Sequence, residues 1–230
     1  MSLRECRLVL ERIMQHSGVH PGLLPAARDS ALYSEAMGLG GLAAVRRYVA
    51  APGWNQCKPL DITDDGDGTR VHCRGQHAWL VAEAVADILC DELRRKGNGK
   101  ITILGVTQPD ELPVVAAAAE RHSIAVDISA NAEHAVICGR LLNAPEGGGL
   151  LQRIRENGLS APAGMWWELF HLGNQALEPD TPISRRHAGP KLVGADVGHG
   201  GTHGDEEDTA EFPFSLIDSS VPPEARLKEG

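Results

Sequence analysis

Residues 181–190 combine the residue types that bind small anions. Thr181 can cap a short helix that has Pro182 at its first position, ends at Gly189 and is followed by Pro190. Free N–H groups at a helix start, together with hydroxyl and guanidinium donors, can hold a carboxylate or phosphate. The alternative is a short surface helix whose arginines keep it soluble. We predict a small carboxylate-like ligand at this segment, bound by Ser184, Arg185, Arg186 and His187.

A second candidate is the turn after residues 101–106, which have the composition of a strand. Thr107 and Gln108 follow its carboxyl end, where ligands of open α/β sheets bind and where the next helix would present free N–H groups. We predict that both side chains bind a polar group of a ligand, although neither is a good acid or base. The alternative is helix capping, because Thr107 and Asp110 fit a capping box with Pro109 in the first turn.

Three residues near the C-terminus have metal-ligating side chains: His199, His203 and Asp205, with His187 as a fourth. Their segment is rich in glycine and must lose much conformational entropy before it binds a metal. Neither a cysteine nor an HExxH motif accompanies them. We therefore predict no metal site, and adventitious binding or a segment without fixed structure is the preferred interpretation.

The elements that must position these groups alternate helix and strand. Apolar residues recur at helical spacing from residue 78 to residue 96, and strand 101–106, helix 111–121 and strand 124–129 follow. This order predicts the α/β class, a parallel or mixed sheet with flanking helices, and a right-handed crossover between the two strands. Strand 101–106 is apolar enough to predict burial on both faces.

Further helices are predicted on both sides of this unit, over residues 3–16, 21–37, 42–49, 150–157 and 163–177. Residues 134–142 fit either a strand or a helix. The Asp/Gly run at 64–68 indicates a hairpin turn rather than a calcium loop, because the glutamate of such a loop is missing. Trp166 and Trp167 are adjacent and cannot face the same way; core packing of both is preferred over one contacting a partner.

The predicted domain organisation is one α/β domain over residues 1–195, followed by a flexible acidic tail over 196–230. The domain divides into a helical cap (1–52), a central α/β unit (61–143) and C-terminal helices (150–190). The formal charge of the chain is -9, and residues 196–230 hold nine Asp or Glu against two basic residues. The acidity therefore belongs to the tail.

Composition excludes several classes of partner and compartment. The chain has no clustered Lys/Arg to neutralise phosphates, so no nucleic acid is expected. It has no run of roughly 20 apolar residues and no secretory signal, so no membrane is expected. Its five cysteines are widely spaced and form no CxxC, which favours reduced thiols and a cytoplasmic location.

Part of the sequence resembles the malate/L-lactate (sulfolactate-type) dehydrogenases. The matching pieces are Ser17-Gly18-Val19, Ala36-Met37-Gly38 and Val45-Arg46-Arg47-Tyr48, and residues 75–131 follow the family's order of helix, strand, helix and strand. The family has a histidine in a Ser-His-Gly turn, at a position that falls near Gly40 here. Its second histidine, in an Asn-Ser-x-His-x-Gly run, corresponds to residues 105–109, which contain none. A Gly-rich dinucleotide fingerprint is also missing, so the sequence names no cofactor.

The resemblance therefore implies a catalytically reduced relative that serves as a small-molecule-binding or partner subunit, as a homo-oligomer or in a heteromer. One alternative is an enzyme that acts on a small carboxylate held by Arg185 or Arg186. Another is an NAD(P)-dependent oxidoreductase whose proton donor is relocated to His77 or His122. The full length also resembles an uncharacterised bacterial family of unknown function, through the element Pro182-x-Ser184-Arg185-x-x-x-Gly189, and this resemblance implies no activity.

Overall fold

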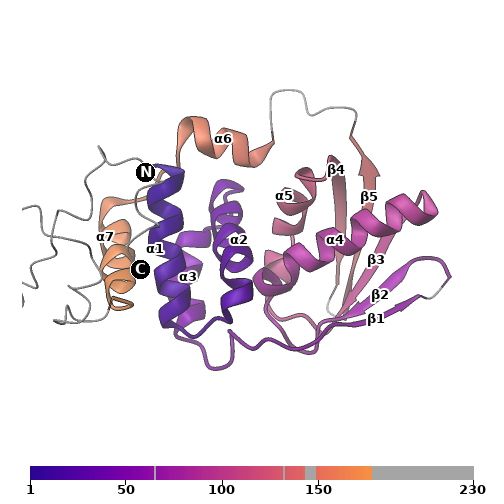
Figure 1. Ribbon diagram of the computed structural model, residues 1–230, viewed down its shortest axis with the longest axis horizontal. Helices are drawn as coiled ribbons and strands as arrows, with labels where there is room; N and C mark the ends of the chain where they lie inside the picture. Colours follow the sequence, from indigo (N-terminus) through magenta and orange to yellow (C-terminus); the bar gives the residue numbers. More distant parts are fainter. Residues whose placement is uncertain (65, 132, 143–148, 178–230) are drawn as a thin grey trace, which may run out of the picture. The chain divides into compact units, whose positions relative to one another are not determined.

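The computed structural model describes residues 1–64, 66–131, 133–142 and 149–177 (Figure 1). All of them belong to one compact unit, Met1–Pro179. The anion-binding segment predicted at 181–190, the weak metal candidates, the domain boundary at residue 195 and the acidic tail lie outside the described residues.

The centre of the fold is a mixed five-stranded sheet, which confirms the α/β class. The strands follow the order β1-β2-β3-β5-β4. The pair β2–β3 is parallel and is joined by the long helix α4 (Ala78–Lys96), whereas the other neighbours are antiparallel. The strands are β1 (Asp61–Asp64), β2 (Thr69–His72), β3 (Gly99–Leu104), β4 (Ile124–Ala130) and β5 (His134–Leu141).

The two strands predicted to form a crossover pair, β3 and β4, lie in one sheet but are not neighbours. Both run antiparallel to β5, so they share a direction with β5 between them. The reason is the hairpin formed by β4 and β5. Residues 134–142, which fitted either a strand or a helix, contain strand β5, and β5 pairs with β3 on one side and with β4 on the other. The two strands that are adjacent and parallel in this sheet are therefore β2 and β3, and α4 is the crossover helix between them.

Burial of β3 on both faces was predicted, and this prediction is wrong. Ile101 and Ile103 are fully buried, but the alternate residues Thr102 and Leu104 are only half-buried. Successive side chains of a strand point to opposite faces. Helix α4 packs on β3 and β5, and α5 (Val114–Glu120) packs on β4, so these helices cover one face only.

The flanking helices follow the predicted ranges closely. Helices α1 (Leu3–His16) and α6 (Leu150–Asn157) have the predicted bounds, and α3 (Gly41–Val49) starts one residue early. The second predicted helix divides into the short 3₁₀ helix η1 (Pro21–Leu23) and α2 (Leu24–Ala36). Helix α2 packs against both α4 and α5 and so joins the N-terminal helices to the layer that covers the sheet.

Helix α7 (Ala163–Asn174) packs against α1 and is three residues shorter than predicted. Trp166 is half-buried, whereas 56% of Trp167 is exposed, so the prediction that both tryptophans pack in the core is wrong. Helix α7 buries Leu169 and Gly173, and Trp167 lies on another side of it. Among the described helices, none is long and apolar enough to cross a membrane.

Gly41 marks a close approach of α2 and α3. A Cβ atom there would lie 2.2 Å from the carbonyl oxygen of Ala31 and 2.7 Å from the backbone nitrogen of Glu35. Backbone atoms inside a helix cannot move aside, so we expect Gly41→Ala to lower the free energy of unfolding by about 2 kcal/mol in urea titrations. Gly164→Ala is the matched control, since a Cβ there meets nothing within 4 Å. Equal stabilities of the two variants would contradict this expectation.

Candidate functional site

The predicted polar turn lies at the carboxyl ends of β2 and β3. The side chains of Thr107 and Gln108 are exposed. The backbone N–H of Thr107 donates to the carbonyl oxygen of Gln76 (2.9 Å), and its own carbonyl accepts from Ala78 (3.1 Å). That the side chains of Thr107 and Gln108 bind a polar group of a ligand stays a prediction.

The capping box predicted for this turn does not form. The 3₁₀ helix η2 (Pro109–Glu111) begins after Gln108, which adopts a left-handed conformation (φ 54°) and makes no side-chain cap. Because Pro109 is the first helical residue, the third position belongs to Glu111 rather than to Asp110. The carboxylate of Glu111 is engaged elsewhere.

A buried cluster of aromatic and polar side chains lies close to this turn. Glu111 accepts hydrogen bonds from the hydroxyl of Tyr48 (3.2 Å) and from the indole Nε1 of Trp79 (2.9 Å). His77 caps α4, because its Nδ1 accepts from the backbone N–H of Trp79 (3.1 Å), and its ring packs on Tyr48 with centroids 4.3 Å apart. The cluster thereby fastens α3 and η2 to the start of α4.

The electrostatics of the cluster follow from its burial. His77 is 2% exposed, and burial lowers its pKa to about 4, so the imidazole is neutral at pH 7. Burial and the adjacent Glu111 carboxylate raise the pKa of Tyr48 to about 12. His122, the other histidine considered as a relocated proton donor, contacts the carboxylate of Asp87 at 3.1 Å on the α4 side of the molecule.

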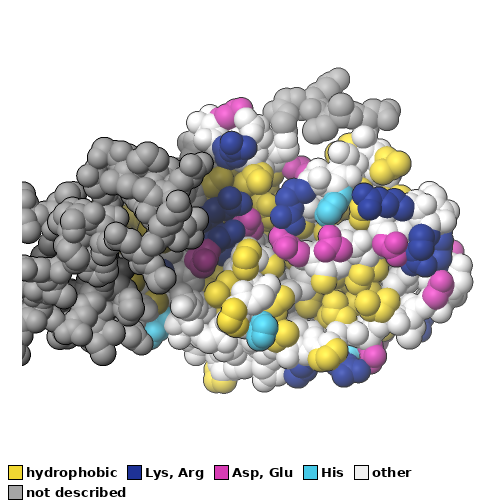
Figure 2. Space-filling view, in the orientation of Figure 1, with side chains coloured by type: hydrophobic (Ala, Val, Ile, Leu, Met, Phe, Trp, Pro, Cys, Tyr) yellow, Lys and Arg dark blue, Asp and Glu magenta, His cyan; other side chains and the backbone are white. Residues whose placement is uncertain are grey.

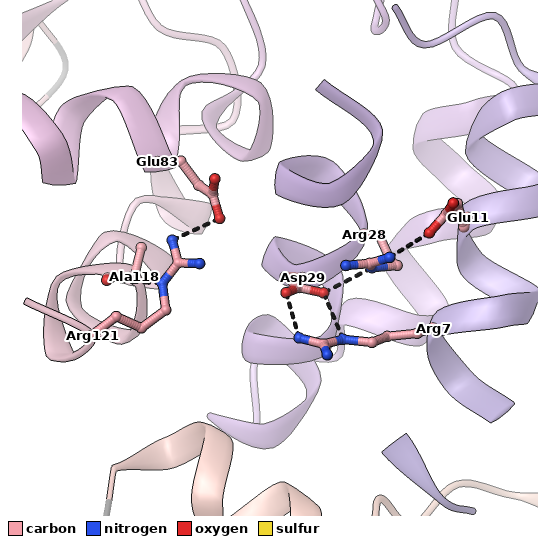
Figure 3. A network of polar contacts seen from close by, with 7 residues as sticks. All are labelled: Arg7, Glu11, Arg28, Asp29, Glu83, Ala118 and Arg121. Atoms are coloured by element: carbon pink, nitrogen blue, oxygen red, sulfur yellow. Dashed lines mark hydrogen bonds and ion pairs between the residues drawn. The ribbon is translucent and has the colours of Figure 1, made fainter. Parts of the chain in front are cut away.

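A second cluster of polar side chains, formed by Arg7, Glu11, Arg28 and Asp29, lies where α1 and α2 pack together. Asp29 is 5% exposed and accepts two hydrogen bonds from Arg7, at 3.1 Å from Nε and 2.7 Å from Nη2 (Figure 3). Arg28 donates to the same carboxylate (Nε to Oδ1, 2.8 Å) and also binds Glu11. One buried carboxylate therefore holds two guanidinium groups in fixed orientations.

Arg7 also lines a depression of about 400 Å³, together with Ser2, Leu3, Arg4 and Arg155. Figure 2 shows basic and acidic side chains together on the surface below α6. Arg4 and Arg7 share one face of α1 because they are three residues apart. Within the described residues, neither Arg4 nor Arg155 forms an ion pair.

The start of α1 is tied to the chain that follows α6, which brings Arg155 to this depression. The amino group of Met1 donates to the carbonyl oxygen of Leu159 (2.9 Å), and the N–H of Leu159 donates back to the carbonyl oxygen of Met1 (3.0 Å). Gly158 permits this contact, since it has a left-handed φ of 70° and a Cβ would lie 2.4 Å from that Met1 oxygen. Backbone hydrogen bonds thus fix the relation of the two helices.

The lining of this depression is cationic. A neighbouring depression of about 310 Å³ is more balanced, since it includes both Glu35 and Arg153. No arrangement of three or more His, Cys, Asp or Glu that could hold a metal occurs in the part of the chain that the structure describes. Guanidinium groups such as those of Arg4 and Arg155 can bind anionic oxygen atoms.

These features define an α/β protein with an arginine-lined surface depression. No family model and no curated protein match the chain. Among solved structures, it is similar to malate dehydrogenase from Entamoeba histolytica, with 9% sequence identity and a TM-score of 0.47. The similarity covers 56% of this chain and 37% of the dehydrogenase chain, so it spans well under half of that enzyme. Values this low carry no information about activity.

Proposed function

We propose that this protein binds a small carboxylate- or phosphate-type anion in the depression lined by Arg4, Arg7 and Arg155. The observation that carries the proposal is that three arginines line the depression and that two of them, Arg4 and Arg155, form no ion pair within the described residues, whereas Arg7 is held by Asp29. A guanidinium binds a carboxylate or phosphate through two parallel N–H···O bonds. A volume of about 400 Å³ lies within the range of small-molecule sites.

The proposal agrees with the small carboxylate-like ligand expected from the sequence, but it assigns the ligand to different arginines. It favours a ligand-binding protein over a hydride-transfer enzyme, because no imidazole is among the lining residues. His77 is buried in its aromatic cluster, and His122 contacts Asp87. Kinship with the dehydrogenases, and assembly into an oligomer or heteromer, stay predictions from the sequence.

Calorimetric titration of the full chain with inorganic phosphate and with succinate tests the proposal. We expect saturable binding that weakens about tenfold in Arg4→Gln and in Arg155→Gln, because each variant loses a charged hydrogen-bond donor. Binding should also weaken as the salt concentration rises. Arg94→Gln is the matched control, since Arg94 is an exposed residue of α4 that does not line the depression. Unchanged affinity in both depression variants would refute the proposal.

A further inference from the structure

Residues 50–60, which connect α3 to β1, form an irregular segment that packs against the aromatic cluster. All of them are described, none belongs to a helix or strand, and Trp54 alone is buried, with 7% of its surface exposed. The indole of Trp54 packs edge-on against the ring of His77, with the ring centroids 6.1 Å apart. One side chain therefore anchors this segment to the cluster.

Two buried hydrogen-bond donors meet at this contact without an acceptor. The Nδ1 of His77 accepts from the backbone N–H of Trp79, so the neutral imidazole carries its proton on Nε2. Within the described residues, neither His77 Nε2 nor Trp54 Nε1 makes a hydrogen bond. Two donors cannot bond to each other, and burying an unpaired donor is unfavourable. The closed segment therefore shields two polar groups from water without replacing the hydrogen bonds that water supplies.

The segment is otherwise attached to the rest of the fold by polar contacts. Asn55 Nδ2 donates to the carbonyl oxygen of Ser17 (2.8 Å). The backbone N–H of Lys58 donates to Gln76 Oε1 (2.9 Å), and Lys58 Nζ donates to the carbonyl oxygen of Arg74 (3.1 Å). A segment with one buried anchor and separate polar attachments opens at a lower free energy than the helices and strands around it.

We propose that residues 50–60 are a lid that opens while the rest of the protein stays folded, and that its opening exposes the imidazole of His77. Three aromatic rings pack on this imidazole: Tyr48, Trp54 and Trp79. Tyr48 and Trp79 belong to helices α3 and α4, whereas Trp54 belongs to the irregular segment. Trp54 is therefore the ring that leaves when the lid opens.

Opening the lid enlarges the polar turn at the carboxyl ends of β2 and β3. His77 forms an isolated parallel bridge with Thr107, and the side chains of Thr107 and Gln108 are exposed. The open lid places an accessible neutral imidazole beside this turn, where the sequence predicted that a polar ligand group binds. The inference is independent of the anion site proposed at Arg4 and Arg155.

Reaction of the full chain with diethyl pyrocarbonate, which acylates accessible neutral imidazoles, tests the lid. Peptide mass spectrometry at pH 7 gives the rate of modification of His77, with the exposed His20 as internal reference. We expect His77 to react in the native protein at a rate that low urea concentrations leave unchanged, because opening the lid exposes little surface. Trp54→Ala removes the anchor and should raise this rate by about tenfold.

Asn55→Ala and Asn157→Ala make the same chemical change at two places. Each removes a side-chain amide that donates to a backbone carbonyl oxygen, that of Ser17 for the lid and that of Arg153 within α6. Asn55→Ala should raise the rate at His77 about fivefold, as expected for one lost hydrogen bond, and Asn157→Ala should leave it unchanged. The lid is refuted if His77 of the wild type reacts only as fast as the whole protein unfolds, or if Asn55→Ala leaves the rate unchanged.

Discussion

The free energy of unfolding is expected to fall by about 3 kcal/mol between pH 7 and pH 4 through His77 alone. Burial lowers the pKa of this histidine from 6.5 to about 4. Between these values the unfolded chain binds a proton that the folded protein does not, so stability falls as the pH falls. The slope approaches about 1.4 kcal/mol per pH unit. The contribution is fully present above pH 6.5 and is lost progressively down to about pH 4.

His77→Asn isolates this effect. An asparagine at the N-cap can accept the hydrogen bond that the Nδ1 of His77 accepts from Trp79, but it does not titrate. Urea titrations from pH 4 to pH 7 should therefore give a flatter stability profile for the variant. Contributions from other groups, such as Asp64 and Asp67 with their lowered pKa values, are common to both proteins and cancel in the difference. Parallel profiles would show that His77 is not buried in the neutral form.

Local sequence signals predicted the elements that depend on local contacts. Helix α1 was predicted with its observed bounds because its apolar stripe is regular, and the structure adds a capping box formed by Ser2 and Glu5. Gly97 ends α4 in the left-handed conformation that glycine adopts readily. The position of β5 depends instead on pairing with both β3 and β4, which no pattern within residues 134–142 specifies.

The candidate sites were harder to predict because their residues are far apart in the sequence. The aromatic cluster joins Tyr48, His77 and Glu111, and no spacing relates these three residues. The proposed anion site had one local signal, the spacing of Arg4 and Arg7 on one face of α1. That spacing is equally typical of a solvated helix surface, and a contact between residues far apart in the sequence, Met1 with Leu159, helps to bring Arg155 to the same place.

Asp29→Ala is expected to lower the free energy of unfolding by about 3 kcal/mol. The buried carboxylate accepts three hydrogen bonds from Arg7 and Arg28, and its removal leaves Arg7 without its ion-pair partner and Arg28 with Glu11 alone. Losing one member of a buried pair typically costs about 3–5 kcal/mol. The lower end applies here because the Arg7 side chain is 33% exposed and can regain water. Urea titration measures the loss.

The control for Asp29 is Asp91→Ala on α4. Asp91 accepts from Arg95 at 2.8 Å, but both side chains are more than half exposed, so the expected loss is below about 1 kcal/mol. Comparable losses in the two variants would show that the Asp29 carboxylate is not a buried partner of the two arginines.

Asp29 also connects stability with the proposed function. The negative charge of Asp29 offsets the positive charge of Arg7, which lines the depression proposed to bind the anion. Asp29→Asn keeps the side-chain shape and removes the charge, so the variant should be less stable while it binds phosphate severalfold more tightly. Stability and affinity changing in opposite directions is the result that a purely structural role of the Arg7–Asp29 pair does not produce. Weaker phosphate binding in Asp29→Asn would instead mean that Arg7 must be held by Asp29 to bind the anion.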